Sequence, residues 1–167
     1  MIKKTGQVWS IDFIIGMMLF LFILLLSVRI ILTMNTTEPY DLTYREAVYL
    51  SDNVLSEGYP KNWTTSDVII PGIALDNKIN AEKLFNYSLI DYNKTKTDYQ
   101  ITGEYLFYFS NGTDILNVTQ CIYGFNVPVA SDCEPIISNL TYSNLAKIDR
   151  IVFYDNQILR MTFYVWS

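Results

Sequence analysis

The sequence of 167 residues contains no histidine, and it has only two cysteines, seven glycines and five prolines. Without histidine there is no imidazole base, no Ser-His-Asp triad and no ordinary zinc site. No glycine-rich loop of the phosphate-binding type occurs either. We therefore expect a protein that is not an enzyme and that needs no cofactor and no metal ion. The absence of histidine leaves open a glycosidase that works with two carboxylates.

A basic surface is also missing. The formal net charge is −5, and the region from Thr33 to Ser167 has 9 Lys and Arg against 16 Asp and Glu, a net charge of −7. No run or stripe of cations is present to neutralise phosphates. We expect no nucleic acid among the partners.

The chain does contain a long apolar stretch near its N-terminus. Phe13 to Val28 holds no charge, and the wider stretch from Ile11 to Leu32 has 22 residues. At about 1.5 Å per residue a helix of this length is about 33 Å long, enough to cross a hydrocarbon core. Lys3 and Lys4 lie just to its N-terminal side, which predicts a cytoplasmic N-terminus and an exported remainder.

Two other interpretations of this stretch remain open. One is a buried core helix, which would need a larger protein around it because the stretch is hydrophobic on every side. The other is a cleaved secretory leader, but Leu32 is followed by Thr33-Met34-Asn35, with no Ala-x-Ala-like site.

The residues in front of the apolar stretch provide a third interpretation. Lys3-Lys4-Thr5-Gly6, followed by Gln7 and a mostly apolar helix, resembles the class III signal peptide of archaeal type IV pilin-like proteins. The resemblance implies that a prepilin-type peptidase cuts after Gly6, so that residues 1–6 are a leader and Gln7 becomes the new N-terminus. It further implies a filament subunit that is assembled with other pilin-like subunits by a membrane platform and an assembly ATPase.

Asp12 is the one carboxylate of the apolar stretch. A lone acid buried without a partner costs several kcal/mol. In a bundle of such helices Asp12 could pair with the free ammonium of a neighbouring Gln7. It could equally lie at the start of the membrane helix and favour the positive end of the helix dipole. For assembly we expect contacts through apolar side chains such as Phe13 and Met17, with Gly16 allowing close approach.

Two features support export of the remainder. Seven of the 13 asparagines stand in Asn-x-Ser/Thr sequons, where chance predicts roughly two; these are Asn35, Asn62, Asn86, Asn93, Asn111, Asn117 and Asn139. The excess predicts a glycosylated surface. The two cysteines, Cys121 and Cys133, predict an extracellular disulfide that closes a 13-residue loop and contributes about 3 kcal/mol.

Helical patterns occur twice after the apolar stretch. Thr43 and Glu46 form a capping-box pattern at the start of a helix expected over residues 42–57. Its buried face is predicted to contain Tyr44, Ala47, Val48, Ser51, Val54 and Leu55. A short helix over residues 80–85 follows, with Asn80 as its cap and Leu84 and Phe85 as its apolar anchors.

Strand patterns dominate the second half. A short strand is expected over residues 68–70 and an aromatic one over 99–109, with Asn111-Gly112 as a turn before a return over 115–122. The clearest hairpin joins residues 147–154 and 157–166 through Asp155-Asn156. Asp91 and Asp98 are expected to flank a basic loop.

The predicted fold class is therefore α+β, with a long N-terminal hydrophobic helix and a small extracellular head containing a second helix and an antiparallel sheet. The expected organisation is a leader over residues 1–6, a transmembrane or filament-core helix over 7–33 and a head over 34–167. The resemblance implies a structural subunit, in the membrane and then in a surface filament, whose glycosylated head serves adhesion. The alternative is an uncleaved single-pass surface domain that binds a ligand or partner.

Overall fold

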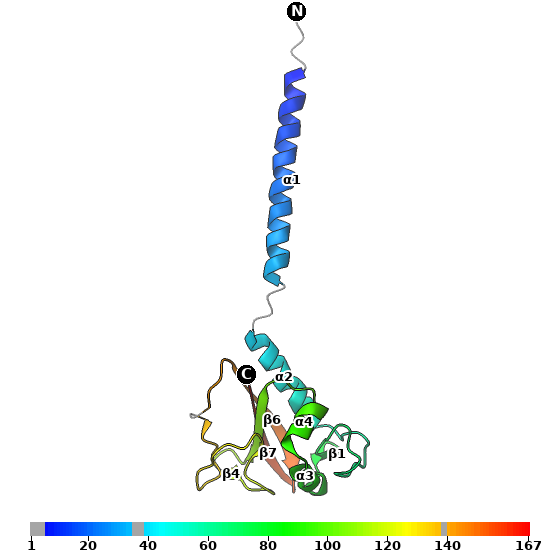
Figure 1. The fold of residues 1–167 in the computed structure, drawn as a ribbon, viewed down its shortest axis with the longest axis vertical. Coiled ribbons are helices and arrows are strands. Elements are labelled where there is room, and N and C mark those ends of the chain that lie inside the picture. Colours follow the sequence, from blue (N-terminus) through cyan, green and yellow to red (C-terminus); the bar gives the residue numbers. More distant parts are fainter. Residues whose placement is uncertain (1–5, 35–38, 138–139) are drawn as a thin grey trace, which may run out of the picture. The chain divides into compact units, whose positions relative to one another are not determined.

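The computed structural model describes residues 6–34, 39–137 and 140–167, and the chain divides into two compact units at residues 38 and 39. The first unit contains one long helix, α1 (Gly6–Met34). The second unit, Pro39–Ser167, is called the head below; it contains the remaining helices and all the described strands (Figure 1). The α+β fold class is confirmed.

Helix α1 contains the predicted membrane-length stretch, Ile11–Leu32. The helix is continuous because no proline interrupts it and because most of its residues are good helix formers such as Leu and Met. The hydroxyl of Ser27 donates a hydrogen bond to the carbonyl of Ile23, at 2.8 Å. This polar group is thus satisfied inside the helix, as an apolar environment requires.

The head is built on a five-stranded antiparallel sheet. Four of its strands follow one another in the order β4 (Ile115–Leu116), β3 (Glu104–Ser110), β7 (Gln157–Trp166) and β6 (Leu145–Tyr154). The fifth strand, β5 (Tyr123–Gly124), pairs with a different part of β3 from the part that pairs with β4. A separate two-stranded ribbon is formed by β1 (Ala74–Leu75) and β2 (Lys78–Ile79). Strand β6 therefore lies at one edge of the main sheet.

The closing hairpin is confirmed. Strands β6 and β7 pair over their whole length, from Tyr154↔Gln157 to Leu145↔Trp166. Asp155 and Asn156 both have positive φ, 46° and 59°, which is the conformation of a type I′ turn. The return after Asn111-Gly112 is present but shorter than the predicted 115–122, because β4 pairs with the end of β3 over two residues only, through Ser110↔Ile115 and Phe109↔Leu116.

Helix α2 (Pro39–Val54) begins three residues earlier than predicted, with Pro39 at its first position. The predicted capping box is wrong, because Thr43 lies inside the helix and is buried. The carboxylate of Glu46 instead accepts a hydrogen bond from the Thr102 hydroxyl, at 2.5 Å. Tyr44, predicted on the buried face, is 44% exposed. The fully buried positions of the helix include Ala47, Leu50, Ser51 and Val54.

Helix α3 (Ala81–Ser88) is capped by Asn80 as predicted, and its Leu84 is buried while Phe85 is half exposed. Helix α4 (Tyr92–Asp98) replaces the predicted basic loop, with Asp91 accepting from the first free amides. The predicted strand over residues 68–70 is wrong: within the described residues it is reduced to a single bridge between Tyr59 and Ile70.

The sheet has a well-covered face and a partly open one. The main core lies between the sheet and the helices, where Phe107 stacks on Tyr123 with ring centroids 4.9 Å apart. On the opposite face a smaller cluster of Leu106, Val127 and Trp166 covers one end of the sheet. The other end of that face leaves apolar side chains exposed, namely Ile151, Phe153 and Ile158.

Candidate functional site

The apolar surface of α1 is the candidate site for membrane insertion and assembly. Every residue from Ile11 to Leu32 is exposed, including Phe13 at 71% and Met17 at 54%. Exposure on all sides is incompatible with a helix left in water, since each buried CH₂ is worth about 0.8 kcal/mol. Length and composition fit a membrane anchor or a signal sequence.

The residues predicted to direct assembly all lie on this helix. Asp12 is exposed one residue into the apolar stretch. Around Gly16 a Cβ atom would meet nothing within 4 Å. Gly16 is therefore not required for packing inside the chain, and it leaves a shallow place on the helix where another backbone can come close.

The residues predicted to direct processing fall at the boundary of the described chain. Helix α1 begins at Gly6, so the predicted cut after Gly6 lies at the first residue of the helix, and Gln7 lies in its first turn. Lys3 and Lys4 lie outside the described residues.

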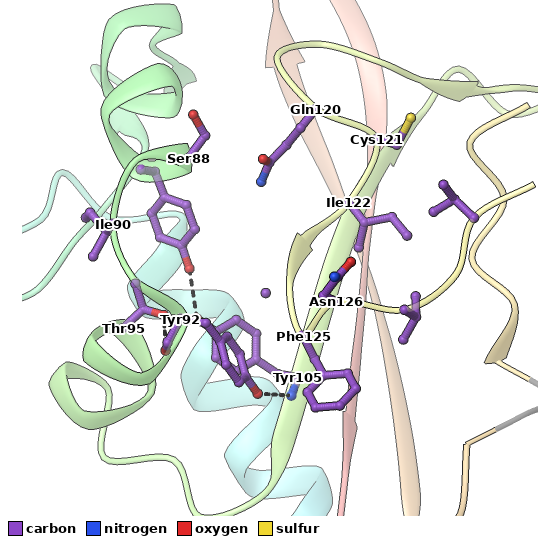
Figure 2. Close-up of a pocket in the computed structure, with 14 residues that line it drawn as sticks. Ser88, Ile90, Tyr92, Thr95, Tyr105, Gln120, Cys121, Ile122, Phe125 and Asn126 are labelled. Carbon is purple, nitrogen blue, oxygen red and sulfur yellow. Dashed lines mark hydrogen bonds between the residues drawn. The ribbon is translucent and has the colours of Figure 1, made fainter. Parts of the chain in front are cut away.

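The head contains a polar cleft that the sequence analysis did not predict. Its volume is about 360 Å³, and it lies between α3 and α4 on one side and the segment around β5 on the other (Figure 2). The described residues that line it are all uncharged, and the polar ones include Ser88, Gln120 and Asn126. No short motif could have predicted it, because its walls come from three separate parts of the sequence: residues 87–95, Tyr105 and residues 120–129.

A directed chain of hydroxyl groups forms the inner wall of this cleft. The Thr95 hydroxyl donates to the carbonyl of Tyr92 at 2.8 Å, and therefore accepts from the Tyr105 hydroxyl at 2.6 Å. The Tyr105 oxygen in turn accepts from the hydroxyl of Tyr87, 3.1 Å away. Each donor has a partner, so the three buried hydroxyl groups are compatible with the core.

These phenols can form hydrogen bonds but do not provide a base. Burial raises the pKa of Tyr87 well above its ordinary value, and the neighbouring Tyr105 raises it further. Burial likewise raises the pKa of Tyr105. Both groups remain neutral at physiological pH, so they contribute neutral hydroxyl groups to the cleft wall.

A charged group lies beside the cleft. The ammonium of Lys96 contacts the Glu104 carboxylate at 2.7 Å, and the Tyr92 hydroxyl donates to the other carboxylate oxygen. Partial burial acts to raise the pKa of Glu104, but the bonds from Lys96 and Tyr92 outweigh it and hold that pKa below the ordinary value. This cluster joins α4 to the start of β3.

The predicted disulfide is present. Cys121 and Cys133 are bonded, with their Cα atoms 5.1 Å apart. Cys121 also lines the cleft, so the bond fixes one of its walls. A disulfide is typical of an oxidising, extracytoplasmic environment.

The sequons are mostly on the surface. Asn62, Asn93, Asn111 and Asn117 are exposed and Asn86 is partly exposed, whereas Asn35 and Asn139 lie outside the described residues. The third residue of one sequon, Thr95, is only 3% exposed and is bonded into the hydroxyl chain. The sequon at Asn93 thus shares a residue with the core of the head.

The described residues contain no group of three or more Cys, Asp or Glu side chains placed to hold an ion. Comparisons with models of known protein families, with curated proteins and with solved structures find no match.

Proposed function

We propose that the chain is a structural subunit, of the minor type, in a surface filament resembling archaeal type IV pili. The observation that carries this proposal is the uninterrupted exposure of apolar side chains along α1 from Ile11 to Leu32. Such a helix has two stable environments, a lipid bilayer and a bundle of similar helices. A pilin-like subunit uses both in turn.

Three features favour the bundle over a permanent anchor. The pattern from Lys3 to Gln7 resembles a cleavage site on the N-terminal side of the apolar stretch. Asp12 supplies a carboxylate that a neighbouring N-terminal ammonium would neutralise, and this pairing would set the axial register of the subunits. The open surface at Gly16 permits close approach of another helix.

The head has the properties expected of an exported domain. Its disulfide, exposed sequons and net acidic composition suit a glycosylated outer surface. In the proposed filament α1 occupies the centre, the head faces outwards for adhesion, and the partners are other pilin-like subunits, the prepilin-type peptidase and the assembly platform. The chain then works by binding and assembly and has no enzymatic activity.

The second candidate function is an uncleaved single-pass surface domain whose head binds a ligand or a partner. The polar cleft beside β5 favours it, because a ligand-binding head needs a cavity of this kind. The same length of α1 would then serve as a permanent anchor.

The mass of the N-terminal peptide from the native protein distinguishes the two functions. The filament proposal predicts a mature chain that begins at Gln7 and that is recovered in purified surface filaments. A native chain that retains Met1 and is found only in the membrane fraction would overturn the proposal and favour the anchored domain.

A further inference from the structure

The outer edge of β6 is an unpaired strand. Within the described part of the head, β6 pairs with β7 alone, and no backbone hydrogen bond joins its outer edge to another element. The two-residue turn after Tyr154 directs the backbone groups of Tyr154 and every second residue before it towards β7. The N–H and C=O groups of the alternate residues, from Leu145 to Phe153, therefore point outwards.

Within the described residues, β2 lies beside the far end of this edge. Lys78 and Ile79 of β2 line a small cavity together with Phe153 and Tyr154. Among the described residues, none forms a backbone hydrogen bond with the outer edge from Leu145 to Ile151, which gives seven residues for pairing with another strand. A long, exposed edge strand is a template for a further strand unless its side chains prevent pairing.

The charges on this edge are arranged in a complementary way. Lys147 and Asp149 lie two residues apart on the same face, exposed, with 3.9 Å between the ammonium and the carboxylate. Ile151, the next residue on that face, is 78% exposed. The edge therefore carries one cation, one anion and an apolar side chain in sequence.

We propose that this edge binds a second copy of the chain, with β6 paired antiparallel to β6 of the other head about a two-fold axis through Ile148. In this register Lys147 lies opposite Asp149 of the second copy, and its own Asp149 lies opposite the other Lys147. Leu145 lies opposite Ile151 in the same way. Each half of the interface thus contains one pair of opposite charges and one apolar pair.

The neighbouring registers are electrostatically poorer. An axis through Lys147 places two ammonium groups opposite each other, and an axis through Asp149 places two carboxylates opposite each other. An axis through Arg150 brings together two guanidinium groups, each of which already binds Asp52 of its own α2 at 2.6 Å. Like charges directly opposite each other destabilise an antiparallel pair.

The pairing closes on itself, so it produces a dimer of heads and not a chain of them. It goes beyond the proposed function because it uses an edge of the head and not α1. In a filament whose subunits all point the same way, such a pair would link the heads of two separate filaments.

A cysteine scan on the full-length protein in detergent tests the register. The Ile148→Cys variant brings two thiols opposite each other and should form a covalent dimer under mild oxidation. In the matched Ile151→Cys variant the two thiols are about 20 Å apart along the strands, and no dimer is expected. Equal cross-linking at both positions would overturn the proposal.

Charge reversal gives the second test. In the Ile148→Cys background, adding Lys147→Glu places like charges opposite each other twice and should reduce the dimer by about tenfold. Adding Asp149→Lys to that variant exchanges the two charges and should restore it. Failure of the double reversal to restore the dimer would contradict the register.

A measurement on the unsubstituted protein covers the possibility that the Ile148 variant does not fold. Chains labelled with ¹⁴N and ¹⁵N are mixed and treated with a carbodiimide that joins ammonium to carboxylate groups. The proposal predicts a mixed-isotope peptide that links Lys147 to Asp149. Links of single-isotope composition only would show that the two residues react within one chain, and the proposal would be wrong.

Discussion

The hydroxyl groups of Thr95 on α4 and Tyr105 on β3 lie 2.6 Å apart in the core of the head. Tyr105 is fully buried, and its ring also packs at an angle against that of Tyr99. A short helix with few apolar residues is thus joined to the central strand by a buried polar contact. The contact and the Asp91 cap both stabilise α4, whose sequence, Tyr92–Asp98, consists mostly of weak helix formers.

Replacing Tyr105 with Phe should destabilise the head by about 1–3 kcal/mol, because the hydroxyl groups of Thr95 and Tyr87 each lose a buried partner. The measurement is thermal unfolding of the full chain in detergent, followed by near-ultraviolet circular dichroism. Tyr49→Phe is the matched control, since Tyr49 is 49% exposed and its substitution should change stability by less than about 0.5 kcal/mol. Equal losses in the two variants would contradict the assigned hydroxyl chain.

The bonds from Lys96 and Tyr92 predict a loss of stability in acid. Because the pKa of Glu104 is lower in the folded head than in the unfolded chain, its contribution is complete above the unfolded value, near 4.5. It is lost as the pH falls through the lower folded value. The Glu104→Gln variant should therefore show a smaller fall in unfolding temperature between pH 6 and pH 3 than the original protein.

The exposed Glu82 in the first turn of α3 offers a matched control. Glu82→Gln should leave the acid dependence of the unfolding temperature close to that of the original protein. The interpretation would be wrong if both substitutions flattened the profile to the same extent.

Elements set by local periodicity were predictable from the sequence. The hairpin of β6 and β7 follows from alternating side chains and a turn dipeptide that tolerates positive φ. The apolar helix follows from length and composition alone. In both cases neighbours along the chain supply the information.

Elements set by distant contacts were not predictable. Glu46 fits a capping box, but its carboxylate binds Thr102, 56 residues away, and α2 continues past the expected start. The burial of tyrosines is also hard to predict from the sequence, because Tyr44 is exposed whereas Tyr99 and Tyr105 are buried. An amphipathic side chain of this kind suits both environments, so the pattern cannot assign it to a face.

Replacement by alanine should have different effects at Gly72 and at Gly16. A Cβ at Gly72 would lie 2.3 Å from the backbone nitrogen of Gly58, whereas a Cβ at Gly16 would meet nothing within 4 Å. Gly72→Ala should therefore lower the stability of the head by more than about 2 kcal/mol, because backbone must move. Gly16→Ala should leave head unfolding unchanged in the same circular-dichroism measurement. A tolerated alanine at residue 72 would mean that the two backbone segments do not approach so closely.

Processing should depend on Gly6. In the Gly6→Val variant, expressed in the native host, a β-branched side chain occupies the position before the proposed cut, and we expect the leader to remain attached. Mass spectrometry of the N-terminal peptide measures this directly, with an expected start at Met1 in place of Gln7. If the leader of the variant were cleaved normally, Gly6 would not be required for cleavage.

Assembly should depend on Asp12 without affecting processing. The Asp12→Ala variant removes the carboxylate proposed to pair with the ammonium of a neighbouring Gln7, so the trimmed chain should remain in the membrane and its yield in sheared filaments should fall. Met18→Leu is a suitable control, because it exchanges one exposed apolar side chain of α1 for another of similar volume. If Asp12→Ala chains entered filaments at the same yield as Met18→Leu chains, the carboxylate would have no part in subunit register. It would then serve only to favour the start of the membrane helix, which is the alternative that its position next to the apolar stretch allows.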